Sequence, residues 1–188
     1  MSITVAKSAG FCFGVNRAIN IVNSLLDKNV KVSTLGPIIH NMEVVNELES
    51  RGCKAVDNID EVEKDATLVI RSHGVPKYVI DKLDENGVKY EDATCPFVKK
   101  IHNIVANPDN KDGIVLIAGN SVHPEVEGII GHCSTECHTF KNSEEIDEIY
   151  NNILKKNNKQ VFVVAQTTFD TKESVSYTHL RAHETSQD

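Results

Sequence analysis

Two of the five cysteines lie where a thiol can act as a metal ligand. Cys12 sits between Gly10 and Gly14, directly before an amphipathic stretch, and glycines let the backbone approach a bulky group. Cys95 precedes Pro96, a residue that favours the first position of a helix. Both thiols are therefore expected at helix N-termini, where the dipole and the free N–H groups stabilise thiolate. Thiolates bind metals and are the usual ligands of iron–sulfur clusters.

Histidines, one acid and two hydroxyls follow other apolar runs. Each lies in a short segment after a β-branched stretch: His40, His73, His123, Glu125, Thr167 and Thr168. Imidazoles, hydroxyls and loop N–H groups can bind phosphate oxygens, so these segments could form a diphosphate pocket. Glu125 follows Pro124, which restrains the backbone, and a carboxyl group in a dry pocket can serve as an acid.

The segments between these residues show an alternation of strands and helices. Strands are predicted at Ile3–Ala6, Val30–Leu35, Ala66–Ile70, Val88–Tyr90, Ile114–Ala118 and Val161–Ala165, with weaker runs at Cys53–Val56 and Cys137–Phe140. Helical periodicity is clearest in three stretches, 15–26, 97–105 and 146–154. Asn142 and Ser143 are candidate caps for the last of these. The alternation with short connections predicts parallel sheets covered by helices, the α/β class.

Two α/β domains are expected, at residues 1–96 and 97–174, with a polar break at 107–113. The stretch 175–188 shows no amphipathic period and is interpreted as an unmatched, disordered tail. In parallel α/β sheets, ligands bind outside the carboxyl ends of the strands. Six strand ends each deliver a Cys, a His or a hydroxyl to that edge, which core packing does not explain.

Composition excludes several classes of protein. The chain has 188 residues and a net charge of −7, which argues against a binder of nucleic acid or anionic membranes. It contains no apolar run long enough for a membrane span and begins without a basic-then-apolar signal, so a cytoplasmic protein is expected. Five is an odd number of cysteines, which makes complete disulfide pairing impossible and favours metal ligands or reactive thiols.

Other polar residues have simpler interpretations. Cys53 fits a buried filler of a weak strand, and His102 fits a residue inside a helix. His132, Cys133, Cys137 and His138 suggest zinc, but no second Cys or His pair follows at finger or ribbon spacing, so structural zinc is not favoured. His179 and His183 lie in the final stretch and are given no role.

Six motifs together resemble one known family. GFCFGVNRAI, PIIHN, SHGV, DATCPFV, GNSVHPEVEG and AQTT, in this order and spacing, closely resemble the 4-hydroxy-3-methylbut-2-enyl diphosphate reductase (LytB/IspH) family. The resemblance covers residues 1 to about 174, and the combination of GFC, ATCP and HPEVEG is not a generic α/β signature. It implies three similar α/β domains around a cavity that holds a 4Fe–4S cluster on three cysteines, with one iron open for substrate.

The resemblance also implies an activity. The family removes the hydroxyl of an allylic diphosphate reductively, giving isopentenyl and dimethylallyl diphosphate in the last step of the non-mevalonate pathway. A ferredoxin or flavodoxin-type donor supplies the two electrons. Carried over by position, Cys12 and Cys95 match cluster ligands, and Glu125 matches the acid. The histidines that hold the diphosphate match His40, His73 and His123, and the hydroxyl that touches substrate matches Thr167 or Thr168.

The family's third cluster cysteine and its Ser–x–Asn loop have no match here, and neither Cys133 nor Cys137 is at the corresponding position. The sequence is therefore expected to lack the third domain and to be inactive alone. Two alternatives stay open on the residues themselves. One is a zinc hydrolase or lyase that uses Cys12, Cys95 and a histidine, with Glu125 as base, and the other is a non-catalytic α/β module that binds phosphate or a partner protein.

Overall fold

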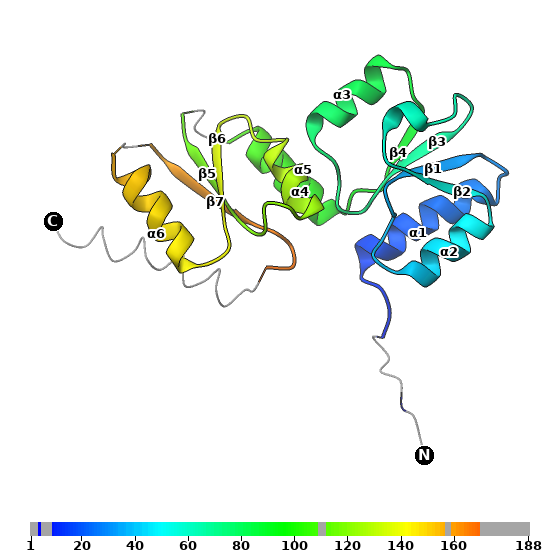
Figure 1. Ribbon diagram of the computed structural model, residues 1–188, viewed down its shortest axis with the longest axis horizontal. Helices are drawn as coiled ribbons and strands as arrows, with labels where there is room; N and C mark the ends of the chain where they lie inside the picture. The colour runs from blue at the N-terminus through cyan, green and yellow to red at the C-terminus, as the bar shows by residue number, and fades with distance from the viewer. Residues whose placement is uncertain (1–3, 5–8, 109–111, 157–158, 170–188) are drawn as a thin grey trace. The chain divides into compact units, whose positions relative to one another are not determined.

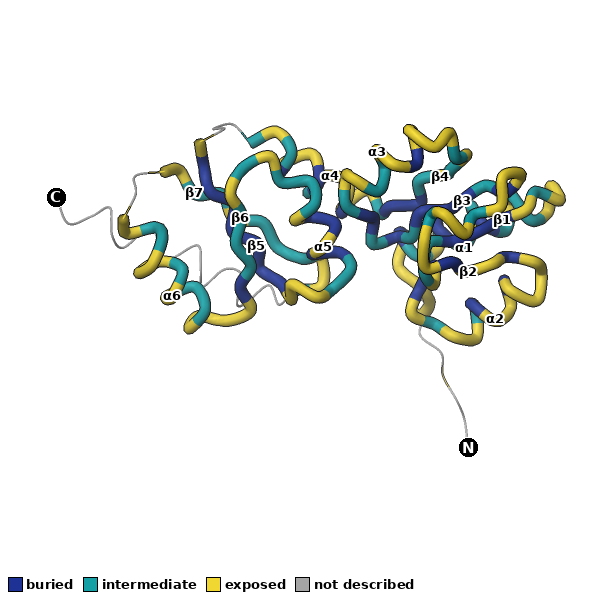
Figure 2. The backbone as a smooth tube through the Cα atoms, turned by 45° about the horizontal axis from the view of Figure 1, so that its top comes forward, coloured by how far each residue is buried: buried dark blue, intermediate teal, exposed yellow. Residues whose placement is uncertain are grey.

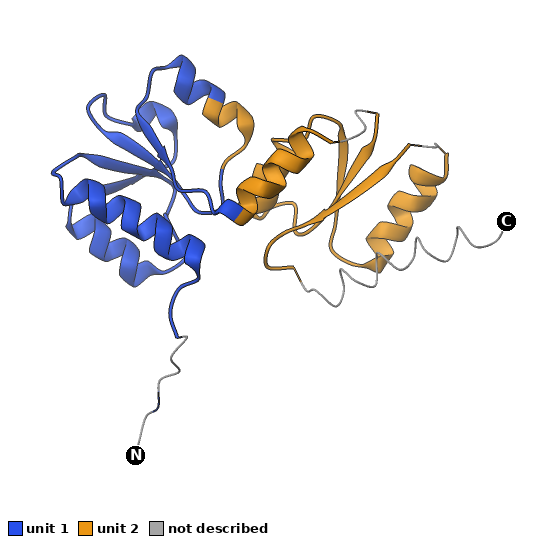
Figure 3. Ribbon diagram, turned by 180° about the vertical axis from the view of Figure 1, so that it is seen from behind, with its two compact units in different colours: residues 1–74, 81–96 blue, residues 75–80, 97–188 orange. Residues whose placement is uncertain are grey.

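The structure is a computed structural model that describes residues 4, 9–108, 112–156 and 159–169. It divides into two compact units, shown in Figure 3. Unit 1 comprises residues 1–74 and 81–96, and unit 2 comprises 75–80 and 97–188. A boundary thus falls between Pro96 and Phe97, but the grouping of segment 75–80 with unit 2 was not expected from sequence. The predicted strand Ile3–Ala6, apart from Thr4, and the stretch 175–188 lie outside the described residues.

Unit 1 contains a four-stranded parallel sheet in the order β2-β1-β3-β4. Its strands are β1 (Val32–Leu35), β2 (Cys53–Val56), β3 (Thr67–Ile70) and β4 (Tyr90–Asp92). Its helices are α1 (Phe13–Leu26), α2 (Met42–Ser50) and α3 (Lys77–Glu85), the last of which begins in segment 75–80, and a 3₁₀ turn lies at Ile59–Glu61. Helices α1 and α2 cover one face of the sheet and α3 the other (Figure 1).

The core of unit 1 follows from the amphipathic period of α1. Ala18 and Val22 lie one turn apart and are fully buried, together with Val69 of β3 and Leu48 of α2. Cys53 belongs to the same core, which confirms the filler interpretation. Figure 2 shows the buried residues concentrated on the central strands. Burial on both faces explains why these strands read as short continuous apolar runs.

Unit 2 contains a three-stranded parallel sheet in the order β6-β5-β7. Its strands are β5 (Ile114–Ala118), β6 (Glu136–Phe140) and β7 (Val161–Ala165). Its helices are α4 (Pro96–Ala106), α5 (Pro124–Ile130) and α6 (Ser143–Asn152), with a 3₁₀ turn at Leu154–Lys156. Val115 and Ile117 pack with α4 and α5, whereas Ile114, Leu116 and Ala118 pack with α6. The side chains of β5 therefore alternate between two apolar layers.

Two predicted strands begin two residues too early, for the same physical reason. Val30 and Val88 were expected to open strands, but each donates its N–H to a carbonyl of the preceding helix, Leu25 and Leu83 respectively, at 3.1 and 3.0 Å. The residue before each has a positive φ, 57° at Asn29 and 63° at Gly87. Such a hydrogen bond commonly ends a helix at its C-terminus. The N–H of the first valine is therefore bonded to the helix, and the strand starts after it.

Three helices were not named from periodicity, and their sequences explain why. Helix α5 has only seven residues, and α2 buries just Val45 and Leu48, so neither supports a long apolar stripe. Helix α3 buries Leu83 alone. The cap prediction for α6 is confirmed, because the Asn142 side chain accepts a hydrogen bond from the Glu145 N–H at 2.9 Å.

Candidate functional site

Each unit contains an interior strand that pairs with a neighbour on either side. In unit 1, β1 lies between β2 and β3, and in unit 2, β5 lies between β6 and β7. The connections after β1 and β3, and those after β5 and β7, therefore diverge at the carboxyl edge of the sheet. In parallel α/β folds, ligands bind in the crevice at such a point of divergence. The predicted histidines, Glu125 and the two threonines lie on these connections, whereas Cys12 precedes α1 and Cys95 follows β4.

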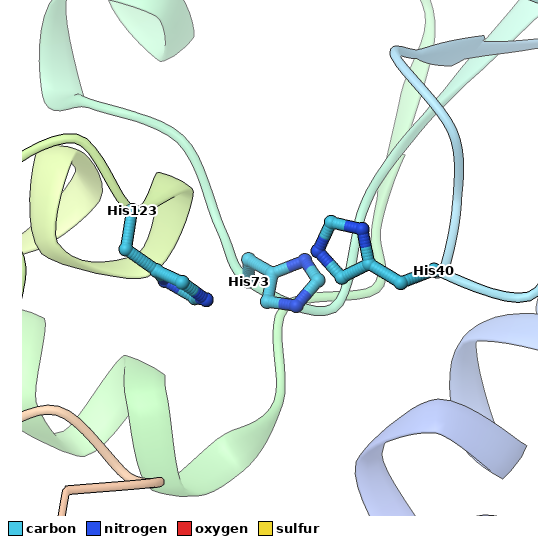
Figure 4. Close-up of side chains that lie close together, drawn as sticks. All are labelled: His40, His73 and His123. Atoms are coloured by element: carbon cyan, nitrogen blue, oxygen red, sulfur yellow. The ribbon is translucent and has the colours of Figure 1, made fainter.

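In unit 1 this topology brings His40 and His73 together. His40 follows β1 and His73 follows β3, and their ring centroids lie 5.0 Å apart with the planes inclined at 49°. Figure 4 shows the two rings close to one another. His40 is exposed and His73 half-buried, so one imidazole is open to a ligand while the other is partly held by the protein.

Local backbone geometry directs both histidines. Gly36 turns the chain directly after β1 with a φ of +68°, and Gly74 follows His73 with a φ of +75°. Glycine adopts this left-handed region without the penalty that a side chain brings. Asn41, next to His40, caps α2 by accepting a hydrogen bond from the Val44 N–H at 3.1 Å. His40 is therefore held between a tight turn and a helix N-terminus.

Cys12 and Cys95 occupy the helix N-termini that were expected for them. Cys12 is the N-cap residue of α1 and is exposed, and Cys95 directly precedes α4. A Cβ built on Gly14 would lie 2.7 Å from the Cys95 Sγ. Glycine at this position thus lets the first turn of α1 approach the Cys95 thiol, because any side chain would displace it. The two cysteines come from distant parts of the sequence and lie at neighbouring helix ends.

Arg17 supports the loop that carries Cys95. Its guanidinium donates hydrogen bonds to the Thr94 carbonyl at 3.3 Å and to the Asp92 carbonyl at 3.1 Å. The Cys95 N–H donates to the Ser72 carbonyl at 2.9 Å, which continues the pairing at the end of β3 and β4. Sequence reasoning missed Arg17. The only sequence signal for its role was its position in α1, five residues after Cys12.

In unit 2, His123 and Glu125 open α5. His123 is the N-cap residue, and its Nδ1 accepts a hydrogen bond from the Glu125 N–H at 3.1 Å. In the neutral ring this contact leaves the proton on Nε2. Pro124 occupies the first helical position, where its missing N–H costs nothing. Figure 4 also labels His123, at the start of this helix.

The Glu125 carboxylate is the most completely held group of the candidate site. It is 2% exposed, and both of its oxygens accept hydrogen bonds from one residue of the other strand end. The Thr167 N–H donates to Oε1 at 2.6 Å, and the Thr167 hydroxyl donates to Oε2 at 2.8 Å. A buried carboxyl group needs such partners because isolated burial is costly. Thr168 is different, because its hydroxyl accepts from the exposed Gln166 side chain at 2.7 Å.

Gly119 lets the two strand ends of unit 2 approach each other. A Cβ at this position would lie 2.8 Å from Val126 Cγ2 and 3.0 Å from Gln166 Oε1. The Gln166 N–H also donates to the Ala118 carbonyl at 2.8 Å, which extends the pairing of β5 with β7. The short distance between α5 and the end of β7 is what allows Thr167 to reach Glu125. Sequence reasoning listed both strand ends but did not connect Thr167 with Glu125.

The remaining polar residues have the following positions. His102 is 5% exposed inside α4 and stacks on His132, with centroids 4.0 Å apart. Burial raises the pKa of the Cys53 thiol to about 11. His132, Cys133, Cys137 and His138 do not bring three ligand atoms within 4.8 Å of one another. His179 and His183 lie outside the described residues.

Comparison with known proteins identifies relatives along almost the whole chain. A family model described as "LytB protein" matches residues 3–186, and so includes most of the stretch 175–188 that the motifs had set apart. A 4-hydroxy-3-methylbut-2-enyl diphosphate reductase of Clostridioides difficile is 39% identical over 177 residues, or 94% of this chain. One from Alkaliphilus oremlandii is 41% identical over 186 residues, or 97% of this chain. Each match covers 62% of the relative, so the chain spans about three fifths of their length.

Solved structures show the same relationship. A structure titled as (E)-4-hydroxy-3-methyl-but-2-enyl diphosphate reductase, the terminal enzyme of the non-mevalonate pathway, matches with a TM-score of 0.80 and 35% identity, over 96% of this chain and 63% of that one. The corresponding reductase from Plasmodium falciparum matches with a TM-score of 0.82 and 27% identity, over 95% of this chain and 55% of that one. These matches bear out the predicted parallel α/β fold.

None of the helices in the described residues combines the length and apolar character that crossing a membrane requires. The family model, the curated relatives and the solved structures all agree, and they do so through the segments that carry the cysteine, histidine and glutamate motifs. The chain belongs to the LytB protein family.

Proposed function

We propose that this chain contributes to an iron–sulfur reductase that removes the hydroxyl of 4-hydroxy-3-methylbut-2-enyl diphosphate. The products are isopentenyl and dimethylallyl diphosphate. The observation that carries the proposal is the pair of thiols at neighbouring helix N-termini, Cys12 and Cys95, in a chain of the LytB family. Both cysteines are free of disulfides, and the Cys12 side chain makes no cap hydrogen bond.

The donor set of unit 1 fits a cluster. Thiolate is favoured where the N-terminus of a helix provides positive potential, and both cysteines occupy such positions. The absence of a side chain at Gly14 keeps the space beside the Cys95 sulfur clear of the helix. A bound 4Fe–4S cluster would supply electrons and a Lewis-acidic iron for the substrate oxygen. Its third thiolate ligand would come from outside the residues described above.

The histidines suit the diphosphate group of the substrate. His40 and His73 follow the two strands that flank the crevice of unit 1, and the N–H groups of their rings can donate to phosphate oxygens. His123 of unit 2 is assigned the same role, because it caps α5 at the carboxyl edge of its sheet and an imidazole N–H can donate to a phosphate oxygen. A diphosphate carries several negative oxygens, so more than one donor is needed to hold it.

Glu125 is the proposed proton donor. Loss of a hydroxyl becomes easier when a proton reaches the oxygen and water leaves. Thr167 holds both carboxylate oxygens, and its own hydroxyl oxygen keeps lone pairs that can accept a hydrogen bond from the substrate hydroxyl. Because of this contact we propose Thr167 for the substrate-facing role in preference to Thr168, whose hydroxyl pairs with Gln166.

The reaction needs two electrons from outside the chain, for which a ferredoxin or flavodoxin-type donor is proposed. Thiolate ligands must also stay reduced and bound, which suits a reducing compartment such as the cytoplasm. These two statements follow from the chemistry of the proposed cluster.

Metal analysis of the full chain tests the proposal. The chain is reconstituted anaerobically with ferrous iron and sulfide, and iron, labile sulfide and zinc are measured. We expect iron and sulfide in the unaltered chain and their loss in Cys12→Ser and Cys95→Ser. Cys53→Ala, which removes a buried thiol of the core, is the matched control and retains both. Zinc binding without iron or sulfide, or iron that is unaffected by Cys12→Ser and Cys95→Ser, would overturn the assignment.

A further inference from the structure

A second pair of cysteines lies in unit 2, apart from the residues assigned to the reductase. Cys133 follows the C-terminal end of α5, and Cys137 lies in β6, with a short turn between them. Cys137 pairs in register with Val115 of the central strand β5. Both side chains pack against the same apolar core, which includes Val115 and Ile129. The two sulfurs are therefore directed to the same side of the sheet.

The two side chains pack against the same core and lie near enough for each thiol to shift the pKa of the other. Cys133 Sγ also lies 3.4 Å from the Ile129 carbonyl oxygen, to which it can donate. Its single proton can thus point to the carbonyl or to the Cys137 sulfur, and the second direction is preferred when Cys137 is ionised. Both residues are half-buried, so a small molecule in solution can reach them.

The surroundings favour ionisation of Cys137. The hydrogen bond from Cys133 and the neighbouring His138 lower the pKa of Cys137 to about 7, against the effect of burial and of Glu136. The pKa of Cys133 is raised, by its hydrogen bond to Cys137 and by burial. The pair thus consists of one nucleophilic thiolate and one thiol beside it. This is the arrangement of an attacking and a resolving cysteine.

A metal site accounts for this cluster less well. The His132 Nδ1 lies 2.9 Å from the Gly128 carbonyl oxygen, and its ring is stacked on His102. The Nε2 of His138 lies 3.0 Å from a carboxylate oxygen of Glu136. One ring nitrogen of each imidazole is therefore engaged with the protein, and the four residues do not bring three ligand atoms together. Two thiols alone do not complete a tetrahedral site.

We propose that Cys133 and Cys137 form an oxidation-sensitive dithiol that hydrogen peroxide converts to a disulfide. The Cys137 thiolate attacks one peroxide oxygen, the O–O bond breaks, and hydroxide leaves and becomes water by taking up a proton. Cys137 then carries a sulfenic acid. The Cys133 sulfur attacks the Cys137 sulfur, the S–O bond breaks, and hydroxide leaves with the Cys133 proton as a second water. In total two thiols lose two electrons and one peroxide gains them.

Peptide mapping of the full chain tests this inference. Trypsin cleavage after Lys111 and Lys141 gives a peptide, residues 112–141, in which Cys133 and Cys137 are the only cysteines. The chain is treated with an equimolar amount of hydrogen peroxide, alkylated with iodoacetamide and digested. We expect this peptide to lose two hydrogens and to escape alkylation, and we expect dithiothreitol to restore double alkylation. This readout needs no variant and no cluster, so it is independent of the proposed function.

Two single variants assign the roles. Cys133→Ser is expected to accumulate a sulfenic acid at Cys137 that dimedone traps. Cys137→Ser is expected to leave Cys133 reduced under the same conditions. Cys53, which is buried and has a raised thiol pKa, is the internal control and stays reduced. The inference would be overturned by a doubly alkylated 112–141 peptide after peroxide treatment, or by sulfinic acid without a disulfide.

Discussion

The two units share a parallel sheet with a central strand, but they hold their candidate site residues in different ways. In unit 1, Cys12 and His40 are exposed, and His73 and Cys95 are half-buried. In unit 2, Glu125 is buried, and both oxygens of its carboxylate are hydrogen-bonded by Thr167. The same sheet edge therefore carries open ligand donors in one unit and a tightly held acid in the other.

This difference matches the chemistry proposed for each unit. A thiolate or imidazole that binds a cluster or a diphosphate must keep its lone pair or N–H available, so the protein positions it through the backbone. Turns and helix ends at Gly36, Asn41 and Gly14 do this in unit 1. A proton donor must instead stand at a fixed orientation, which direct hydrogen bonds provide. The contrast between the units is what the following experiments test.

The largest effect is expected from Glu125→Gln. The amide keeps the shape and can still accept from the Thr167 N–H, but it cannot donate a proton to a leaving hydroxyl. In an assembly that supplies the third cluster ligand and turns over, the rate should fall by about 10²–10⁴-fold, the usual contribution of general acid catalysis. Steady-state kinetics at saturating substrate measure this. Full turnover by Glu125→Gln would show that Glu125 is not the proton donor, and the proposed difference between the two units would then be wrong.

Gly14→Ala should have the next largest effect, and it acts on unit 1. The new methyl group would lie 2.7 Å from the Cys95 sulfur, so the thiol or the helix must move. Overpacking of this kind costs about 1–3 kcal/mol of unfolding free energy. We expect less iron per chain after reconstitution. Asn20→Ala, an exposed substitution on the same helix, is the control and should bind iron normally.

A smaller effect should separate Thr167 from Thr168. Thr167→Val removes a hydrogen bond to a buried carboxylate, which is worth about 1.5–3 kcal/mol. Thr168→Val removes a contact with an exposed amide and should change the unfolding free energy by less than about 0.5 kcal/mol. Denaturant unfolding of the two variants measures the difference. Equal losses of unfolding free energy in the two variants would show that the Thr167 hydrogen bond does not hold the Glu125 carboxylate in place.

A further comparison concerns two cysteines in equivalent strands. Cys53 opens β2 and Cys137 lies in β6, and both strands flank the central strand of their unit. The pKa of Cys53 is raised to about 11 by burial, whereas that of Cys137 is lowered to about 7. Iodoacetamide at mildly alkaline pH should therefore label Cys137 roughly 10–100-fold faster than Cys53. The rate for Cys137 should decrease as the pH falls below about 7, because the thiol becomes protonated.

Sequence reasoning described the elements well but misplaced some of their ends. The short strands Cys53–Val56, Ile114–Ala118 and Val161–Ala165 were predicted with their observed bounds. The predicted strand starts at Val30 and Val88 were wrong because the N–H of each valine donates to a carbonyl of the preceding helix. β propensity does not indicate such a hydrogen bond. The short helix α5 escaped prediction because its main signals are a proline and a cap.

Residue types and spacing alone determined the α/β class and the strand ends that carry chemistry, because hydrophobic period and turn residues are local properties of the chain. They also determined that Cys12 and Cys95 would begin helices. The tertiary structure decided which of these residues meet: His40 with His73, Thr167 rather than Thr168 with Glu125, and Cys133 with Cys137. The first two pairings join residues far apart in sequence and depend on strand order, and the second also depends on the close approach at Gly119.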